Sequence, residues 1–290
     1  MARKRILRVA ALNIKTQPHS SDIYGELFER AVAGRLKAKV RGERMGTVVS
    51  MWKMTADPKW RSGALYLFTN LDPFDTWFDE QTRKPIEQDK KAAPIIPTNL
   101  KPHLRQAPFV FSCQDHRLFF SITDIAPSSA CKFFDALLNQ PLITEGIGAV
   151  DVSIESKPDS IKKILSMPSL RTLSIDISLH NDDTFSNQKR RFLERMETRN
   201  VRREKTELTA RDTNGLKPDK DLRIMMEIAT SNGRVVASGK DLAGEKQIIE
   251  TDEHPLTHVI RYDPDYTDIA SVIAQASVKL LEVIRGNHRM

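Results

Sequence analysis

The stretch FVFSCQDHRLFFSI, residues 109–122, decides the predicted fold. It contains two short runs rich in Phe, Val and Leu, which flank the polar triplet Gln114-Asp115-His116. Apolar and aromatic runs of this length on either side of a polar turn are typical of an antiparallel β-hairpin. We therefore expect antiparallel sheet near the middle of the chain, with the triplet at the turn.

The sequence on both sides of this hairpin alternates between a period of two and a period of about 3.6, which predicts a mixture of strands and helices. Strands are predicted at residues 6–14, 45–54, 63–71, 149–156, 170–179, 234–240, 245–251 and 257–263. Helices are predicted at residues 22–39, 127–143, 158–167, 219–229 and 265–285, and a long loop at 81–106. Paired strands with helices at their ends favour an α+β fold, mostly antiparallel sheet with flanking helices, over a doubly wound sheet.

A charged region interrupts this alternation. No Gly or Pro occurs between residues 184 and 214, and most of this segment is charged or polar. We therefore expect an α+β body built from residues 1–182 and 232–290. The charged helical region, residues 183–231, is expected to be an insertion that projects from the body or covers one of its faces.

Composition limits the class of protein. Of the 290 residues, 40% are hydrophobic and 29% are charged, which is ordinary for a soluble globular protein. The two cysteines, Cys113 and Cys131, make neither a disulfide framework nor a zinc site, and they fit a reducing compartment. No apolar window approaches the length of a membrane span, so we expect a cytoplasmic protein without direct membrane insertion.

Much of the net charge of +7 lies in the stretch NQKRRFLERMETRNVRREK, residues 187–205, which holds eight Lys or Arg and three Glu. On a helix, Phe192 and Met196 would pack on the body. Arginines spaced four, four and three apart would form a stripe on another face. Guanidinium groups bind phosphate oxygens in a bidentate way, so such a stripe suits a nucleic-acid backbone.

A second basic cluster strengthens this hypothesis. Residues 30–44 contain six Lys or Arg and one Glu, and a third group of basic residues lies at the N-terminus. If the first two clusters converge, they form a groove for duplex DNA. The expected DNA-contacting residues are Lys189, Arg190, Arg191, Arg195, Arg199, Arg202 and Arg203 on one wall, and Arg35, Lys37, Lys39 and Arg41 on the other.

The alternative is a solvated charged helix. Glu194, Glu197 and Glu204 lie at spacings that allow ion pairs with the arginines of the same helix. The clusters also contain few aromatic residues on which single-stranded bases would stack. If nucleic acid binds, contact with the duplex backbone and little reading of sequence is therefore the better fit.

A metal-dependent nuclease is the main enzymatic alternative. Glu155 and Lys157 form an E-x-K tripeptide on a predicted strand, with Asp135, Glu145 and Asp151 upstream. Two carboxylates can hold Mg²⁺ while a lysine helps to form hydroxide. The tripeptide is common, however, and strand alternation places Asp151, Glu155 and Lys157 on the solvent-facing side, so we favour an ordinary exposed face.

The sequence predicts no other chemistry. The seven histidines are scattered, and Pro255 lies between His254 and His258, the only pair four residues apart. Neither a phosphate-binding G-x-x-x-x-G-K-[ST] loop nor a G-x-S-x-G element occurs. We therefore predict no catalytic residue, no metal ligand and no cofactor.

The C-terminal half, residues 150–284, has the order of a strand VDVSIES, a helix SIKKIL, a strand LSIDISL, a charged helical stretch, further strands and a final amphipathic helix. In this order it resembles the RexA-like phage-exclusion proteins of lambda-type prophages. The best local match is SGKDLAGE, residues 238–245. The same layout is similar to that of an uncharacterised bacterial family of similar length.

This resemblance implies a cytoplasmic, dimeric protein that binds DNA without sequence preference. It also implies a role in antiviral defence by abortive infection, with a membrane protein as partner, and carries no catalytic motif. The final helix offers an apolar face for a homodimer contact, with Ile273, Leu280 and Ile284 among its residues. The alternative is that this face packs on the helix's own sheet.

Overall fold

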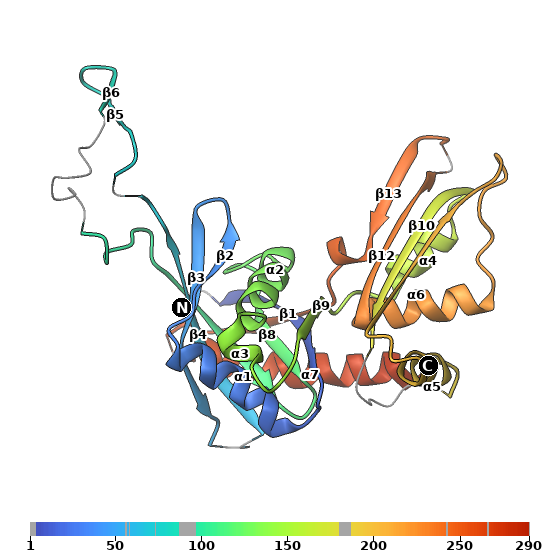
Figure 1. Cartoon of the computed structure of the whole chain (residues 1–290), viewed down its shortest axis with the longest axis horizontal. Helices are drawn as coiled ribbons and strands as arrows, with labels where there is room; N and C mark the ends of the chain where they lie inside the picture. Colours follow the sequence, from blue (N-terminus) through green and yellow to red (C-terminus); the bar gives the residue numbers. More distant parts are fainter. Residues whose placement is uncertain are drawn as a thin grey trace.

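We describe the computed structural model for residues 4–55, 57, 59–72, 74–86, 97–179, 187–241, 243–265 and 267–289. It is an α+β structure of mostly antiparallel sheet, as predicted from the sequence. Two units are visible in Figure 1, each built around a sheet of its own. We call them the large unit and the small unit.

The large unit contains an eight-stranded sheet. Its main path runs β14-β1-β8-β7-β4-β3-β2, and β9 pairs with the second half of β1 beyond the end of β14. The strands are β1 (Arg5–Thr16), β2 (Ala38–Arg41), β3 (Arg44–Lys53), β4 (Trp60–Thr69), β7 (Arg105–Ser112), β8 (Arg117–Ser121), β9 (Val150–Ile154) and β14 (Thr257–Tyr262). The predicted hairpin is confirmed, because β7 pairs with β8 in the register Phe111 to Leu118.

Helices cover both faces of this sheet. One face packs on α1 (Ser21–Ala33), α2 (Pro127–Leu138) and the short α3 (Pro141–Thr144), and the other packs on α7 (Ile269–Arg289). Strand β1 is apolar on both sides as a result. Leu12 and Ile14 face the first core, and Val9 and Ala11 face α7.

The apolar face of α7 is therefore occupied within the chain. Ile273, Leu280 and Ile284 are all at most 3% exposed and pack against the large sheet. This is the alternative that the sequence left open, and it removes this face as the basis for the expected homodimer contact.

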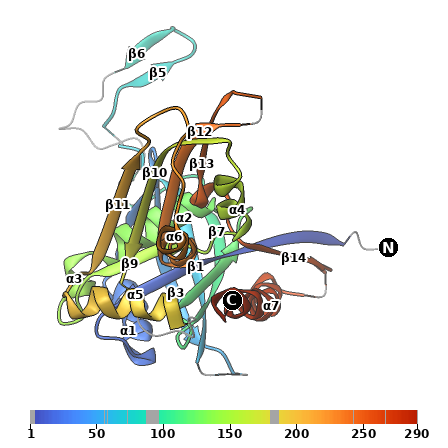
Figure 2. The ribbon, with the colours of Figure 1, turned by 90° about the vertical axis from the view of Figure 1, so that its right-hand side faces the viewer.

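The small unit contains a four-stranded sheet in the order β11-β10-β12-β13. Its strands are β10 (Ser169–Ser178), β11 (Arg203–Thr209), β12 (Gly233–Lys240) and β13 (Lys246–Glu250), followed by the 3₁₀ turn η1 (Thr251–Glu253). One face of the sheet shares a core with α4 (Asp159–Leu165), α5 (Asn187–Thr198) and α6 (Lys220–Asn232). In Figure 2, α6 is seen end-on and α5 from the side, so the two helices cross steeply.

This grouping differs from the predicted domains. The segment expected to be an insertion, 183–231, contributes β11 to a sheet whose other strands were assigned to the body, and its helices α5 and α6 pack on one face of that sheet. Its predicted start falls at 180–186, outside the described residues. The pairing of β10 with β12, more than fifty positions later in the chain, carried no local signal in the sequence.

The charged helix is also shorter than expected. It ends at Thr198, and Asn200 adopts a left-handed conformation with φ of 54°. Asparagine tolerates this conformation, so it can end a helix where the sequence offers neither Gly nor Pro. The chain then continues as β11, in which alternate side chains turn toward the core.

A thin arm extends from the large unit between β4 and β7 (Figure 1). Its tip is the two-stranded ribbon of β5 (Trp77–Asp79) and β6 (Lys84–Ile86). The long loop predicted at 81–106 is therefore confirmed only in part. Residues 97–104 form no strand or helix, but residues 84–86 form β6 and β7 begins at Arg105. Residues 87–96 lie outside the described residues.

Candidate functional site

Helix α5 separates apolar from basic side chains. Phe192, Leu193 and Met196 are buried in the core of the small unit. Arg191 and Arg195, one turn apart, are exposed on the opposite side. The guanidinium carbon of Arg195 lies 4.7 Å from the centre of the Phe192 ring, a cation–π contact that helps to position it.

The exposed side of α5 forms a groove with the first turn of α6. The groove has a volume of about 300 Å³, and Arg191, Arg195, Lys220 and Asp221 lie along it. Three cations and one carboxylate give it a positive balance. Arg199, just beyond the end of α5, is also exposed, and its backbone N–H donates to the Arg195 carbonyl at 3.2 Å, so it continues the positive surface by one more turn.

Two of the residues predicted to contact DNA do not lie on this surface. Arg202 and Arg203 follow the end of α5, and each binds a carboxylate. Arg202 Nε donates to Asp151 at 3.0 Å, and Arg203 makes a bidentate pair with Asp176 at 2.6 and 2.5 Å. Since Asp151 belongs to β9, the first pair ties the small unit to the large unit. These arginines therefore do not continue the stripe.

Two further predicted contacts on α5 are also paired. Lys189 lies on the inward side, is 6% exposed, and places its Nζ 3.1 Å from the Glu227 carboxylate. Lys189 precedes the three buried apolar residues of α5 by three, four and seven positions, so it falls on the same side of the helix as they do. Arg190 is exposed and pairs with Glu194 at 3.4 Å, as the solvated-helix alternative anticipated.

The second predicted wall lies elsewhere. Arg35 and Lys37 belong to the link after α1, and Lys39 and Arg41 lie on β2, an edge strand of the large sheet. All four are exposed. Figure 1 shows β2 and α5 on different units, with α2 and β9 between them. The two clusters are therefore separate surfaces and not facing walls of one groove.

The E-x-K residues do not lie on a solvent-facing side together. Glu155 is 3% exposed and Ser153 is 8% exposed, whereas Lys157 is exposed. The expected alternation is wrong here because α6 covers this end of β9. The Ser153 hydroxyl donates to the backbone oxygen of Ser231 on α6 at 2.7 Å. With Glu155 enclosed and Lys157 outside, the nuclease alternative loses the geometry on which it rested.

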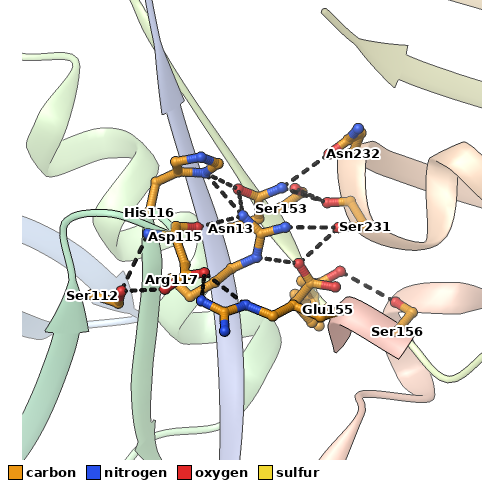
Figure 3. A network of polar contacts seen from close by, with 12 residues as sticks. Asn13, Ser112, Asp115, His116, Arg117, Ser153, Glu155, Ser156, Ser231 and Asn232 are labelled. Atoms are coloured by element: carbon orange, nitrogen blue, oxygen red, sulfur yellow. Dashed lines mark hydrogen bonds and ion pairs between the residues drawn. The ribbon is translucent and has the colours of Figure 1, made fainter. Parts of the chain in front are cut away.

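Glu155 instead belongs to a buried polar network at the junction of the two units (Figure 3). Arg117, at the start of β8, donates from Nε to Glu155 Oε1 at 2.6 Å and from Nη1 to Asn13 Oδ1 at 2.8 Å. From α6, the Ser231 hydroxyl donates to the same Glu155 oxygen at 2.7 Å. Asn13 Nδ2 donates to Asn232 Oδ1 at 2.9 Å. The network thus connects β1, β8 and β9 with α6.

A charged cavity of about 330 Å³ lies beside this junction. It is bounded by α2, β9 and the helix-free face of the small sheet. Its charged lining residues are Lys132, Asp135, Asp151, Asp176, Arg203, Arg234 and Asp252. Among the residues that the structure describes, no three His, Cys, Asp or Glu side chains are placed to hold a metal ion.

Several groups in the cavity or next to it have pKa values outside their ordinary ranges. Burial raises the pKa of Asp252 to about 6, and burial together with the neighbouring Asp151 raises the pKa of Asp135. Lys15 on β1 is 2% exposed, and its Nζ donates to the Ser178 hydroxyl. Burial lowers the pKa of Lys15 to about 7. The charge state of the junction therefore changes near neutral pH.

Sequence reasoning missed the junction residues, although weak signals existed. Asn13 and Lys15 are polar positions within an otherwise apolar strand, and Arg117 begins an apolar run. A polar residue in a strand buried on both faces requires a polar partner. The partners come from α6 and β10, which no local pattern places beside β1.

Comparison with known protein families identifies the family of this chain. The chain belongs to the DUF4747 family. This family is described as a domain of unknown function, and its profile matches residues 5–278, which include both units. No curated protein matches the chain. Within the described ranges, no helix combines the length and the apolar character needed to cross a membrane.

Proposed function

We propose that the protein binds the phosphate backbone of duplex DNA, without sequence preference, through the exposed side of α5 and the first turn of α6. The observation that carries this proposal is the placement of Arg191 and Arg195 one helical turn apart along a groove that also contains Lys220. Arg199 extends the same surface. Phosphate contacts fix a protein on DNA but carry no direct sequence information.

The spacing of these cations suits a polyanion. One turn of helix advances about 5.4 Å, and duplex DNA carries about one charge per 1.7 Å of its axis. Each guanidinium can therefore find a phosphate oxygen and bind it in a bidentate way. Four contacts, from Arg191, Arg195, Arg199 and Lys220, replace the larger set that the sequence suggested.

The biological role that we propose is phage exclusion in the cytoplasm, with the protein acting as a homodimer in abortive infection. This part rests on the resemblance of residues 150–284 to the RexA-like proteins. The same resemblance suggests a membrane protein as a partner. The apolar face of α7 does not supply the dimer contact, so another surface would have to do so.

The proposal is tested by measuring fluorescence anisotropy with short labelled DNAs. Two duplexes of unrelated sequence should bind with affinities within about threefold of each other, and a single strand should bind more weakly. The variant Arg191→Ala/Arg195→Ala should weaken binding to both duplexes alike. Lys240→Ala/Lys246→Ala removes the same charge from two exposed residues that face each other at one end of the β12–β13 pair, and should bind as the wild type does.

Two results would contradict the proposal. One is equal weakening by both double variants, which would show that only overall charge matters. The other is unchanged binding in the α5 variant with its fold intact. The same DNAs incubated with Mg²⁺ and separated by gel would reveal cleavage, the outcome that the nuclease alternative requires.

A further inference from the structure

A second candidate site lies on the opposite side of α5. A cavity of about 230 Å³ is formed where the C-terminal part of α7 meets α4, α5 and α6. Figure 1 shows α7 running from the large unit to the small unit, where it ends near α5. Ile161, Leu165 and Ile284 line the cavity together with four charged residues, Glu155, Lys162, Lys189 and Glu227. Apolar walls with a few fixed polar groups are typical of small-molecule sites.

Lys189 supplies a positive group to this cavity. It is 6% exposed, and its one ion pair among the described residues is with Glu227, whose side chain is 50% exposed. An ammonium group has three donors, so this pair leaves donors for a ligand. Taking a lysine out of water is costly unless other groups satisfy it. A bound carboxylate would offset that cost.

Glu155 supplies a negative group to the same cavity. It is 3% exposed, and its hydrogen bonds with Arg117 and Ser231 both end on Oε1. Neither of these two hydrogen bonds ends on its other oxygen, Oε2. The carboxylate is held in one orientation by its two neighbours, so a ligand would not have to order it.

We propose that the cavity binds a small zwitterion with an apolar side chain, of the class of the aliphatic α-amino acids. The carboxylate of the ligand pairs with Lys189 and its ammonium group pairs with Glu155. Its aliphatic part packs against Ile161, Leu165 and Ile284. This site does not depend on DNA binding, because it faces inward from α5 while the arginine groove faces outward.

The experiment is calorimetric titration of the full chain with three probes that share one branched aliphatic group. L-leucine carries both charges, 4-methylpentanoate lacks the ammonium group, and 3-methylbutan-1-amine lacks the carboxylate. L-leucine should bind at least about tenfold more tightly than either analogue. Equal affinity for leucine and one analogue would overturn the zwitterion, since one of the two charged residues would then be unused.

Two matched variants locate the binding. Lys189→Met keeps the length of the side chain but removes its charge, and should weaken leucine binding by about tenfold or more. Lys163→Met, at an exposed lysine of α4 that does not line the cavity, should leave it unchanged. Leu165→Phe, which fills the cavity without altering a buried charge, should abolish binding. Wild-type affinity in folded Lys189→Met or Leu165→Phe protein, or no heat with the wild type, would overturn the proposal.

Discussion

Arginine and lysine residues have different surroundings at the junction of the two units and on the outer side of α5. At the junction, Arg117 and Lys15 are at most 2% exposed, and named side chains from both units bind them. On α5, Arg191 and Arg195 face solvent along an open groove. A folded protein loses stability when the partner of a buried cation is removed, whereas an exposed cation can be changed at little cost in stability. The comparison assigns a structural role to the first set and leaves the second set for a partner.

The largest effect is expected from breaking the buried pair. Arg117→Met leaves the Glu155 carboxylate buried without its cation, and should lower the free energy of unfolding by about 3–5 kcal/mol. Urea denaturation followed by circular dichroism measures this loss. The double variant Arg117→Met/Glu155→Leu removes both charges and should be more stable than Arg117→Met alone. A loss below about 1 kcal/mol in the single variant would place this pair with the surface ion pairs.

The sequence predicted those parts of the molecule that depend on local pattern. The hairpin at 109–122 and the helices near 127–138 and 265–285 follow from periodicity and turn residues. The junction could not be predicted in this way. Whether Glu155 is buried or exposed depends on α6, which covers it from a position more than seventy residues later in the chain. Lys189 likewise turns inward because of its place on α5, which its charge does not reveal.

The second prediction concerns the pH dependence of the junction. Lys15 has a pKa of about 7 in the folded protein against an ordinary 10.5, so the unfolded chain binds one more proton between these values. Stability from this group therefore rises with pH above about 7, by at most about 1.4 kcal/mol per pH unit. Burial is the main cause of this lowered pKa. Among the neighbouring charges, Asp151 and Glu155 raise the pKa, whereas Arg117 and Arg203 lower it further.

Urea denaturation of the wild type and Lys15→Met at several pH values checks this dependence. Over two pH units above neutrality, the wild type should gain up to about 3 kcal/mol relative to the variant. Parallel profiles for the two proteins would contradict an uncharged Lys15 at high pH.

A smaller effect of opposite sign is expected from Asp252. Its pKa of about 6 in the folded protein lies above the ordinary 3.8, so the folded chain binds more protons between these values. Stability from this carboxyl group is therefore lost as pH rises from about 4 to 6. This loss should be only about 1 kcal/mol, because the side chain is only partly enclosed, and Asp252→Asn should remove it. Unfolding curves at about pH 4 and about pH 6 measure this loss for both proteins. An equal loss of unfolding free energy in the variant and the wild type would contradict the expectation.

The smallest effect on stability is expected on α5. Arg191→Ala/Arg195→Ala should change the free energy of unfolding by less than about 1 kcal/mol, because exposed charge changes usually cost within about 0.5 kcal/mol each. Thermal unfolding at one protein concentration compares the variant with the wild type. A loss comparable to that of Arg117→Met would mean that the groove arginines are structural and would erase the contrast between the two regions.

The salt dependence of duplex affinity tests the central claim most directly. If Arg191, Arg195, Arg199 and Lys220 each neutralise one phosphate, log K against log salt should have a slope of about −3.6, using about −0.9 per contact. Arg191→Ala/Arg195→Ala should reduce the magnitude of that slope by about 2 while its unfolding curve stays close to that of the wild type. A wild-type slope in this folded variant would contradict the account, because the exposed arginines of α5 would then be a solvated surface and not a binding site.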